Sequence, residues 1–214
     1  MLKPCIIGLG YVGLPILLNL SKKIKTIGFD INKKRILDLK NSRDTFNEFK
    51  KRDFAKKKIF FTNDFLKAKS ANFFIVAVPT PISKSKYPDL SHLKKVSENI
   101  SKILKKGDII FFESTVYPGV TNNLCKTILE KKSKLIEGKD FFIGYSPERV
   151  NPGDKNHSLK KIDKILAYTH KYKIKNIIGL YKNLAKKIIF TKNIEEAETA
   201  KVIENIQRDV NIGL

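Results

Sequence analysis

Short apolar runs recur along the chain, and helical patterns fill most of the gaps between them. The runs read CIIG from residue 5, KTIGFD at 25–30, KIFFT at 58–62, ANFFIVAVPTP at 71–81, DIIFFEST at 108–115 and DFFIGYSPE at 140–148. Residues 90–104 place Leu93 and Val96 on one helical face, and Ser91 is a suitable N-cap for this helix. Near-continuous apolar strands are typical of parallel sheets that helices cover on both faces. The alternation therefore predicts an α/β fold, a doubly wound parallel sheet.

The carboxyl ends of the predicted strands carry several residues that could do chemistry. Ligands of doubly wound sheets bind in the crevice outside these ends. The residues there are Gly8–Gly13, Asp30, Val78–Pro81, Glu113–Thr115 and Tyr145–Glu148. Glu148 lies in GYSPERVNPGD, where a carboxylate follows a buried strand. From position alone two interpretations are equally good: a group that takes part in a reaction, or a turn carboxylate paired with Arg149.

The chain has 214 residues, of which 42% are hydrophobic, and a formal net charge of +22. Such a charge could indicate nucleic-acid binding. However, the lysines are spread along the whole chain and arginine is rare, whereas direct readout of bases favours arginine. We therefore interpret the charge as a compositional bias and expect no nucleic-acid partner. A positive field would still attract a substrate that carries phosphate.

Membrane insertion, disulfides and metal binding have little support in the sequence. No stretch reaches the roughly 18 apolar residues of a membrane span. The apolar N-terminus lacks a small-residue cleavage site and is interrupted by glycines, so we expect it to fold and the protein to be cytoplasmic. Cys5 and Cys125 are too few for a disulfide framework, and no spacing typical of zinc ligands occurs. We expect no bound metal.

The first strand, turn and helix contain the pattern G-x-G-x-x-G at Gly8, Gly10 and Gly13. Gly8 would permit the tight turn, Gly10 would let the backbone approach a pyrophosphate, and Gly13 would let the helix pack closely on the strand. The N-terminus of the helix offers unpaired N–H groups and a partial positive charge to phosphates. The motif in this context predicts a dinucleotide site.

Asp30 ends the second predicted strand, 17 residues after Gly13, close to where a ribose-binding acid is expected. A carboxylate within ~4 Å of a 2′-phosphate would be repelled by roughly 4 kcal/mol at an effective dielectric constant near 20. We therefore predict NAD rather than NADP, although Lys33, Lys34 and Arg35 could partly offset the repulsion. The alternative is an ordinary strand–helix–strand unit with a chance glycine pattern.

Five motifs in order carry a family resemblance: IIGLGYVGLP, VAVPTP, ESTVYPGVT, GYSPERVNPGD and EAETAKVIENIQRDVNIGL. The chain resembles the UDP-glucose/GDP-mannose dehydrogenase family from Leu2 to Leu214. The third and fourth motifs look like the branch that acts on UDP-N-acetylglucosamine or its galactosamine epimer. The resemblance implies a Rossmann-like domain that binds NAD, a UDP-sugar substrate and a homodimer. Such enzymes oxidise the sugar C6 alcohol to a carboxylate with two NAD for surface polysaccharide synthesis.

The resemblance also implies roles for individual residues. The cofactor-binding residues would be Gly8, Gly10, Tyr11, Val12, Gly13, Asp30, Arg35, Pro79, Thr80 and Thr115. The substrate-binding residues would be Glu148, Arg149, Val150, Lys201, Asn205 and Arg208. Thr115, Glu148, Lys201 and Asn205 would be catalytic. Glu148 would handle a proton or water, and Lys201 and Asn205 would stabilise oxyanions, for which an ammonium and an amide N–H are suitable donors.

The last segment, residues 194–214, has the pattern of a helix with two distinct faces. A polar face contains Glu198, Lys201, Asn205 and Arg208, and an apolar face contains Ile203, Ile206, Val210 and Leu214. By pattern alone the polar face is typical of a solvated surface. The resemblance instead implies that residues 1–193 form an NAD-binding domain and that 194–214 begin a long connecting and dimerisation helix.

No counterpart of the family's second half follows this helix. In the family that half carries a catalytic cysteine in a GHCIGVDP-like motif, because aldehyde oxidation passes through a thiohemiacetal and needs a thiolate. Cys5 and Cys125 fall at predicted core positions, so we expect no substitute nucleophile. Three interpretations remain: an N-terminal fragment, one half of a split enzyme, or a non-catalytic module that binds NAD or a nucleotide. We expect the isolated chain to be inactive and to self-associate.

Overall fold

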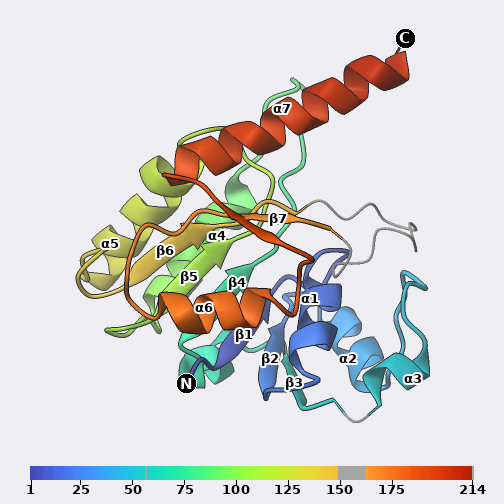
Figure 1. The fold of residues 1–214 in the computed structure, drawn as a ribbon. Coiled ribbons are helices and arrows are strands. Elements are labelled where there is room, and N and C mark those ends of the chain that lie inside the picture. Colours follow the sequence, from blue (N-terminus) through green and yellow to red (C-terminus); the bar gives the residue numbers. More distant parts are fainter. Residues whose placement is uncertain (56, 149–161, 214) are drawn as a thin grey trace.

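A six-stranded parallel sheet forms the centre of the computed structural model, which describes residues 1–55, 57–148 and 162–213 (Figure 1). Its strands lie in the order β3-β2-β1-β4-β5-β6. They are β1 (Pro4–Ile7), β2 (Thr26–Phe29), β3 (Ile59–Thr62), β4 (Phe73–Val76), β5 (Ile109–Phe112) and β6 (Phe142–Tyr145). The order reverses between β1 and β4, which makes their carboxyl ends the topological switch point. The predicted doubly wound sheet is confirmed.

Helices cover both faces of this sheet. The helical elements are α1 (Gly13–Leu20), α2 (Lys33–Lys40), α3 (Lys51–Phe54), η1 (Phe65–Ser70), α4 (Ser91–Ser101), η2 (Thr121–Lys126), α5 (Thr127–Ser133), α6 (Ile174–Tyr181) and α7 (Ile194–Gly213). One apolar core joins the sheet to α1, α2 and α6, and a second joins its other face to α4, α5 and the start of α7. Alternate strand residues supply the two cores, as Ile6 and Ile7 do. Burial on both faces explains the near-continuous apolar runs of the sequence.

A second, two-stranded parallel sheet of β7 (Lys164–Leu166) and β8 (Ile188–Phe190) was not predicted from the sequence. It is attached to the edge of the main sheet, because Tyr145 and Ala167 exchange backbone hydrogen bonds of 2.9 Å in both directions. This attachment brings residues from beyond position 161 to the carboxyl end of β6.

The predicted N-cap of α4 was wrong. Leu90 occupies the N-cap position, and Ser91 is the first residue of the helix. The backbone N–H of Ser91 donates to Asp89 Oδ1 at 2.9 Å, so the aspartate side chain accepts from the first turn in place of the serine.

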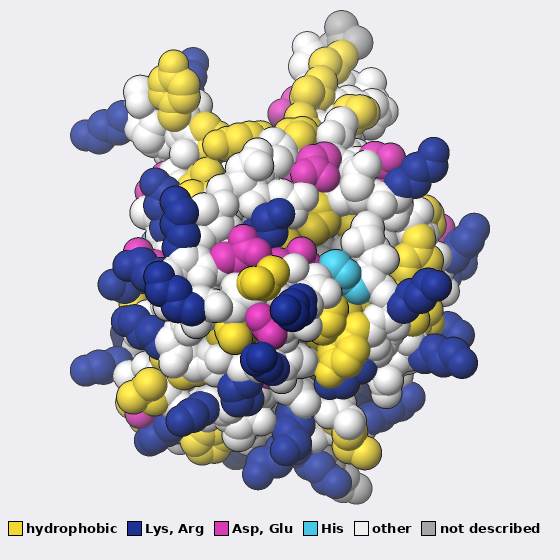
Figure 2. All heavy atoms as spheres, turned by 90° about the vertical axis from the view of Figure 1, so that its left-hand side faces the viewer, with side chains coloured by type: hydrophobic (Ala, Val, Ile, Leu, Met, Phe, Trp, Pro, Cys, Tyr) yellow, Lys and Arg dark blue, Asp and Glu magenta, His cyan; other side chains and the backbone are white. Residues whose placement is uncertain are grey.

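Helix α7 leaves the body of the protein after its first turns (Figure 1). Ile194 and Ala197 belong to the core, whereas Ile203, Ile206 and Val210 are each more than half exposed. No helix in the described part of the chain is long and apolar enough to cross a membrane. Figure 2 shows Lys and Arg side chains scattered over one face of the protein instead of gathered into one patch.

Candidate active site

A cleft of about 740 Å³ opens at the carboxyl ends of the central strands. The loop after β1 lines one part of it, and the residues that follow β4 and β5 line another. Glu148 after β6 and three residues of α7 complete the lining. A crevice at the switch point of a doubly wound sheet is the expected place for a ligand.

The glycine loop leaves room in this cleft for a ligand's phosphates. Gly8 has φ +89°, and a Cβ there would lie 2.6 Å from Ala77 O. A Cβ on Gly13 would overlap Gly8 O, so the first and third glycines are required by the packing of the protein itself. A Cβ on Gly10 would meet nothing within 4 Å. The open space at Gly10, beside the first turn of α1, fits the close approach of a pyrophosphate.

Asp30 is held in a fixed orientation beside the glycine loop. Its Oδ2 atom accepts a hydrogen bond of 2.8 Å from Leu9 N, and its Oδ1 atom accepts one of 2.9 Å from Asn32 N. Because Asp30 is half-buried and lines the cleft, its carboxylate can still accept from the hydroxyls of a ribose. This geometry is compatible with the prediction of NAD.

Arg35 does not line the cleft and instead supports the glycine loop from behind. Its Nε donates to Leu9 O at 3.0 Å, and its Nη1 donates to Asp44 Oδ1 at 2.7 Å. The guanidinium also lies over the ring of Phe46, which in turn packs against Tyr11. The Nη2 atom of Arg35 is buried and has no hydrogen-bond partner among the described residues. A contact between Arg35 and a cofactor would therefore have to use Nη2.

Two side-chain hydroxyls connect the ends of β4 and β5. Thr80 Oγ1 donates to Thr115 O at 2.6 Å, and Ser114 Oγ donates to Val78 O at 2.6 Å. Thr80, Thr115 and Pro79 all line the cleft. The two hydrogen bonds keep these strand ends together, and the Thr115 hydroxyl projects from a fixed backbone.

Glu148 belongs to a buried cluster of charged groups at the ends of β5 and β6. Lys164 Nζ lies 2.8 Å from Glu113 Oε2 and 3.0 Å from Glu148 Oε2. Tyr181 OH donates to Glu113 Oε1 at 2.8 Å. Burial raises the pKa of Glu113, and the Lys164 ammonium opposes this effect. The partner of Glu148 proposed from the sequence, Arg149, lies outside the described residues, as does Val150.

Helix α7 contributes Lys201, Asn205 and Arg208 to the lining of the cleft. The Lys201 side chain is buried, and its Nζ lies 3.3 Å from Glu204 Oε2. Burial lowers the pKa of Lys201, while the negative charge of Glu204 acts in the opposite direction. A partly desolvated ammonium next to the cleft is a suitable donor to an oxyanion.

Glu198, which the sequence placed on the same helical face, has a different environment. It is fully buried, and its Oε2 and Oε1 atoms accept backbone hydrogen bonds of 2.6 Å from Gly119 N and 3.0 Å from Thr121 N. Glu198 therefore fixes α7 against the start of η2 and sets where Lys201, one turn later, enters the cleft.

Most of the predicted site residues meet in this one cleft. Its lining includes Gly8, Gly10, Tyr11, Val12, Asp30, Pro79, Thr80, Thr115, Glu148, Lys201, Asn205 and Arg208. Gly13 and Arg35 are outside the lining and support the loop. The sequence did not single out the lining residues Phe46, His92, Lys95 and Asn99, nor Lys164 and Tyr181 beside the cleft. The lysines among them do not differ from the many other lysines of the chain, and none of these residues belongs to a motif that marks a site.

Both cysteines are buried away from the cleft. Cys5 lies in β1 and Cys125 in η2, and each is at most 1% exposed. Burial raises the pKa of the Cys125 thiol to about 12 and that of Cys5 further, so neither forms a thiolate readily near neutral pH. Within the described residues no group of His, Cys, Asp and Glu is arranged to hold a metal ion.

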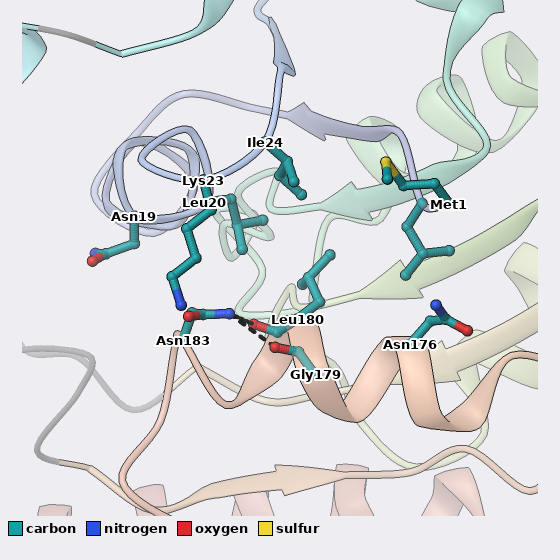
Figure 3. Close-up of a pocket in the computed structure, with 10 residues that line it drawn as sticks. Met1, Asn19, Leu20, Lys23, Ile24, Asn176, Gly179, Leu180 and Asn183 are labelled. Carbon is teal, nitrogen blue, oxygen red and sulfur yellow. Dashed lines mark hydrogen bonds between the residues drawn. The ribbon is translucent and has the colours of Figure 1, made fainter.

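A smaller hollow of about 190 Å³ lies at the opposite, amino end of the sheet, between α1 and α6 (Figure 3). Asn183 Nδ2 donates to Gly179 O at 2.8 Å and to Leu180 O at 3.3 Å, so its amide already serves the end of α6. The remaining lining is mostly apolar and carries no acid–base pair. The chemistry is therefore concentrated at the carboxyl ends of the strands.

Comparison with known proteins identifies the family. The model described as "UDP-glucose/GDP-mannose dehydrogenase family, NAD binding domain" matches residues 2–185. UDP-N-acetyl-D-glucosamine 6-dehydrogenase of Salmonella typhi is 45% identical over 214 residues, covering 99% of this chain and 50% of the relative. The protein of the same name from Pseudomonas aeruginosa is 46% identical over 219 residues, covering 100% of this chain and 51% of the relative.

A solved structure gives the same result in three dimensions. The UDP-D-ManNAc dehydrogenase of Pyrococcus horikoshii matches with a TM-score of 0.89 at 30% identity, over 98% of this chain and 51% of that one. The chain thus spans about half the length of the curated relatives it matches. The chain belongs to the UDP-glucose/GDP-mannose dehydrogenase family, and residues 2–185 are its NAD-binding domain.

Proposed function

We propose that this chain supplies the NAD-binding half of an enzyme that oxidises C6 of a UDP-N-acetylhexosamine to a carboxylate, for surface polysaccharide synthesis. The observation that carries the proposal is the single cleft in which the glycine loop and Asp30 lie together with Glu148, Lys201 and Asn205. The identity to two UDP-N-acetyl-D-glucosamine 6-dehydrogenases, at 45% and 46%, favours that sugar over the mannosamine relatives, which are 31–36% identical.

In the proposed reaction NAD, when bound, accepts the hydride that leaves C6. The glycine loop and the first turn of α1 would hold its pyrophosphate, and Asp30 would hold a ribose hydroxyl. Glu148 would take the proton that the alcohol loses, directly or through a water molecule. Lys201 and Asn205 would donate hydrogen bonds to the oxygen on C6 while it carries negative charge.

The second oxidation, from aldehyde to acid, needs more than the described residues provide. In the proposed mechanism a thiolate would attack the aldehyde to give a thiohemiacetal, which would pass its hydride to a second NAD as the hydroxyl proton is lost, and water would hydrolyse the resulting thioester to the acid and the free thiol. Because Cys5 and Cys125 are buried and poorly acidic, we expect this thiol to come from the half of the relatives that the chain does not span. We propose the boundary of the two parts near residue 193, where α7 begins.

The test is product formation with this chain and the second half supplied together. NAD and UDP-N-acetylglucosamine are added, and the reduced cofactor and the sugar acid are measured. We expect two reduced cofactors for each acid formed, and no acid from this chain by itself. Acid production by the isolated chain would contradict the assignment of both cysteines as structural, and no turnover by the combination would contradict the proposed function.

A further inference from the structure

Lys164 lies at the centre of the charged cluster beside the cleft, but none of the roles proposed above belongs to it. Its side chain is 5% exposed, and its ammonium group lies between the carboxylates of Glu113 and Glu148, at 2.8 Å and 3.0 Å. Tyr181 completes the cluster with its hydrogen bond to the second oxygen of Glu113. Glu113 and Glu148 line the cleft, so Lys164 contacts the cleft wall from behind.

The backbone that carries Lys164 is held at the edge of the main sheet. The paired hydrogen bonds between Tyr145 and Ala167 attach β7 to β6, and Ser146 Oγ donates to Ile165 O at 2.8 Å. Lys164 N also donates at 2.9 Å to the backbone oxygen of Lys187, the residue just before β8. These contacts fix the start of the Lys164 side chain, so its ammonium group has little freedom to leave the two carboxylates.

The ammonium group of Lys164 allows both carboxylates of the cluster to stay ionised. Two carboxylates that share a buried site repel each other, and the pKa of one rises unless a cation lies between them. Burial alone would lower the pKa of Lys164, but the two carboxylates raise it above its ordinary value, so Lys164 stays charged. Burial followed by the charge of Glu113 raises the pKa of Tyr181, which therefore remains a neutral donor.

We propose that Lys164 is a positioning residue that keeps Glu148 ionised and holds its carboxylate at the end of β6. This inference rests on the proposed function, in which Glu148 accepts the proton of the C6 alcohol. A carboxyl group that is already protonated cannot accept that proton, so loss of Lys164 would lower the fraction of ionised Glu148 as the pH falls below neutral. Lys164 itself is not among the residues that line the cleft. Among the described residues, the titratable groups around the cluster include Glu113 after β5, Tyr145 of β6, Tyr181 of α6 and Lys201 of α7, with Glu198 beside Tyr145.

The first test measures protonation directly in this chain. Infrared spectra are recorded across the pH range in which the chain stays folded, and the carboxyl band of Glu148 is identified by its loss in Glu148→Gln. In Lys164→Met we expect the midpoint of that band to move upward by about 1 to 3 pH units, the shift that a neighbouring opposite charge typically causes. Lys164→Arg keeps the charge and should leave the midpoint near that of the wild type.

The second test uses the chain combined with the second half and follows kcat/KM against pH. The acidic limb should move upward in Lys164→Met by the same interval, whereas a purely structural loss would lower the profile equally at every pH. If Lys164→Met does not fold, Lys164→Gln carries the same two predictions. Unchanged midpoints with NAD binding intact would overturn the role of Lys164, whereas a wild type that binds no NAD would count against the proposed function instead.

Discussion

Glu198 is expected to determine whether α7 stays docked on the body of the protein. Its carboxylate accepts two buried backbone hydrogen bonds, from Gly119 N at 2.6 Å and Thr121 N at 3.0 Å. Glu198→Ala would leave both N–H groups without an acceptor in a region that excludes water. The predicted result is a large loss of folding stability, together with a misplaced Lys201.

The magnitude follows from the two orphaned donors. A buried donor that loses its partner costs about 1–3 kcal/mol, so two such donors cost about 2–6 kcal/mol. Burial raises the pKa of Glu198, so removing its charge recovers part of this loss. We therefore expect the free energy of unfolding to fall by about 2–5 kcal/mol, with about 2–4 °C of melting temperature for each kcal/mol in a chain of this size. Glu198→Gln, which keeps one acceptor oxygen, should fall in between.

Denaturant unfolding followed by circular dichroism provides the measurement, with Glu195→Ala as a matched control on the same helix. Among the described residues the Glu195 carboxylate accepts one hydrogen bond, of 2.6 Å from Asn122 Nδ2, and Asn122 is partly exposed and can turn to water. Its loss should cost under about 1 kcal/mol. Equal stabilities of Glu198→Ala and Glu195→Ala would refute the account of how α7 is held.

Two further predictions concern the cofactor and the surface of α7. Asp30→Ala should relax the preference for NAD toward NADP, because the carboxylate that repels a 2′-phosphate is gone while Lys33 and Lys34 remain. Calorimetry measures both affinities, and equal affinity of the wild type for the two cofactors would count against the preference. The exposed side chains of Ile203 and Ile206 should make the isolated chain self-associate. Lysine at both positions should reduce the association measured by sedimentation, and a wild-type chain that stays monomeric at every concentration would contradict the prediction.

The sequence predicted the main sheet because burial on both faces left a strong signal. Each of β1, β2, β4, β5 and β6 is buried at every position, so a continuous apolar run identified it. The strands β7 and β8 have only three residues each, and β8 is largely exposed, so neither differs from the surrounding lysine-rich segments. The N-cap of α4 was wrong because residue preference favours Ser91 at that position, whereas the helix begins at Ser91 itself and Leu90, which has no capping side chain, precedes it. Asp89 accepts from Ser91 N instead, and only the backbone geometry shows this.

The site was predictable where backbone geometry requires a residue type and less so where only charge matters. Gly8 and Gly13 are fixed by close packing, so the glycine spacing marked the loop. Lys164 could not be recognised, because its role depends on a β7–β6 contact that no local pattern encodes. Glu198 and Lys201 share a helical face in the sequence, but Glu198 accepts backbone hydrogen bonds while Lys201 lines the cleft.

Turnover of Glu148→Gln, compared with its affinity for NAD, tests the central claim that cofactor and acid–base chemistry share this cleft. The substitution keeps the size of the side chain and removes its charge. In the chain combined with the second half, we predict that kcat falls by a factor of about 10² to 10⁴, as for a positioned acid–base group, while NAD affinity measured by calorimetry stays nearly constant. Unchanged turnover would contradict the claim and would leave Glu148 with a structural role, such as its ion pair with Lys164.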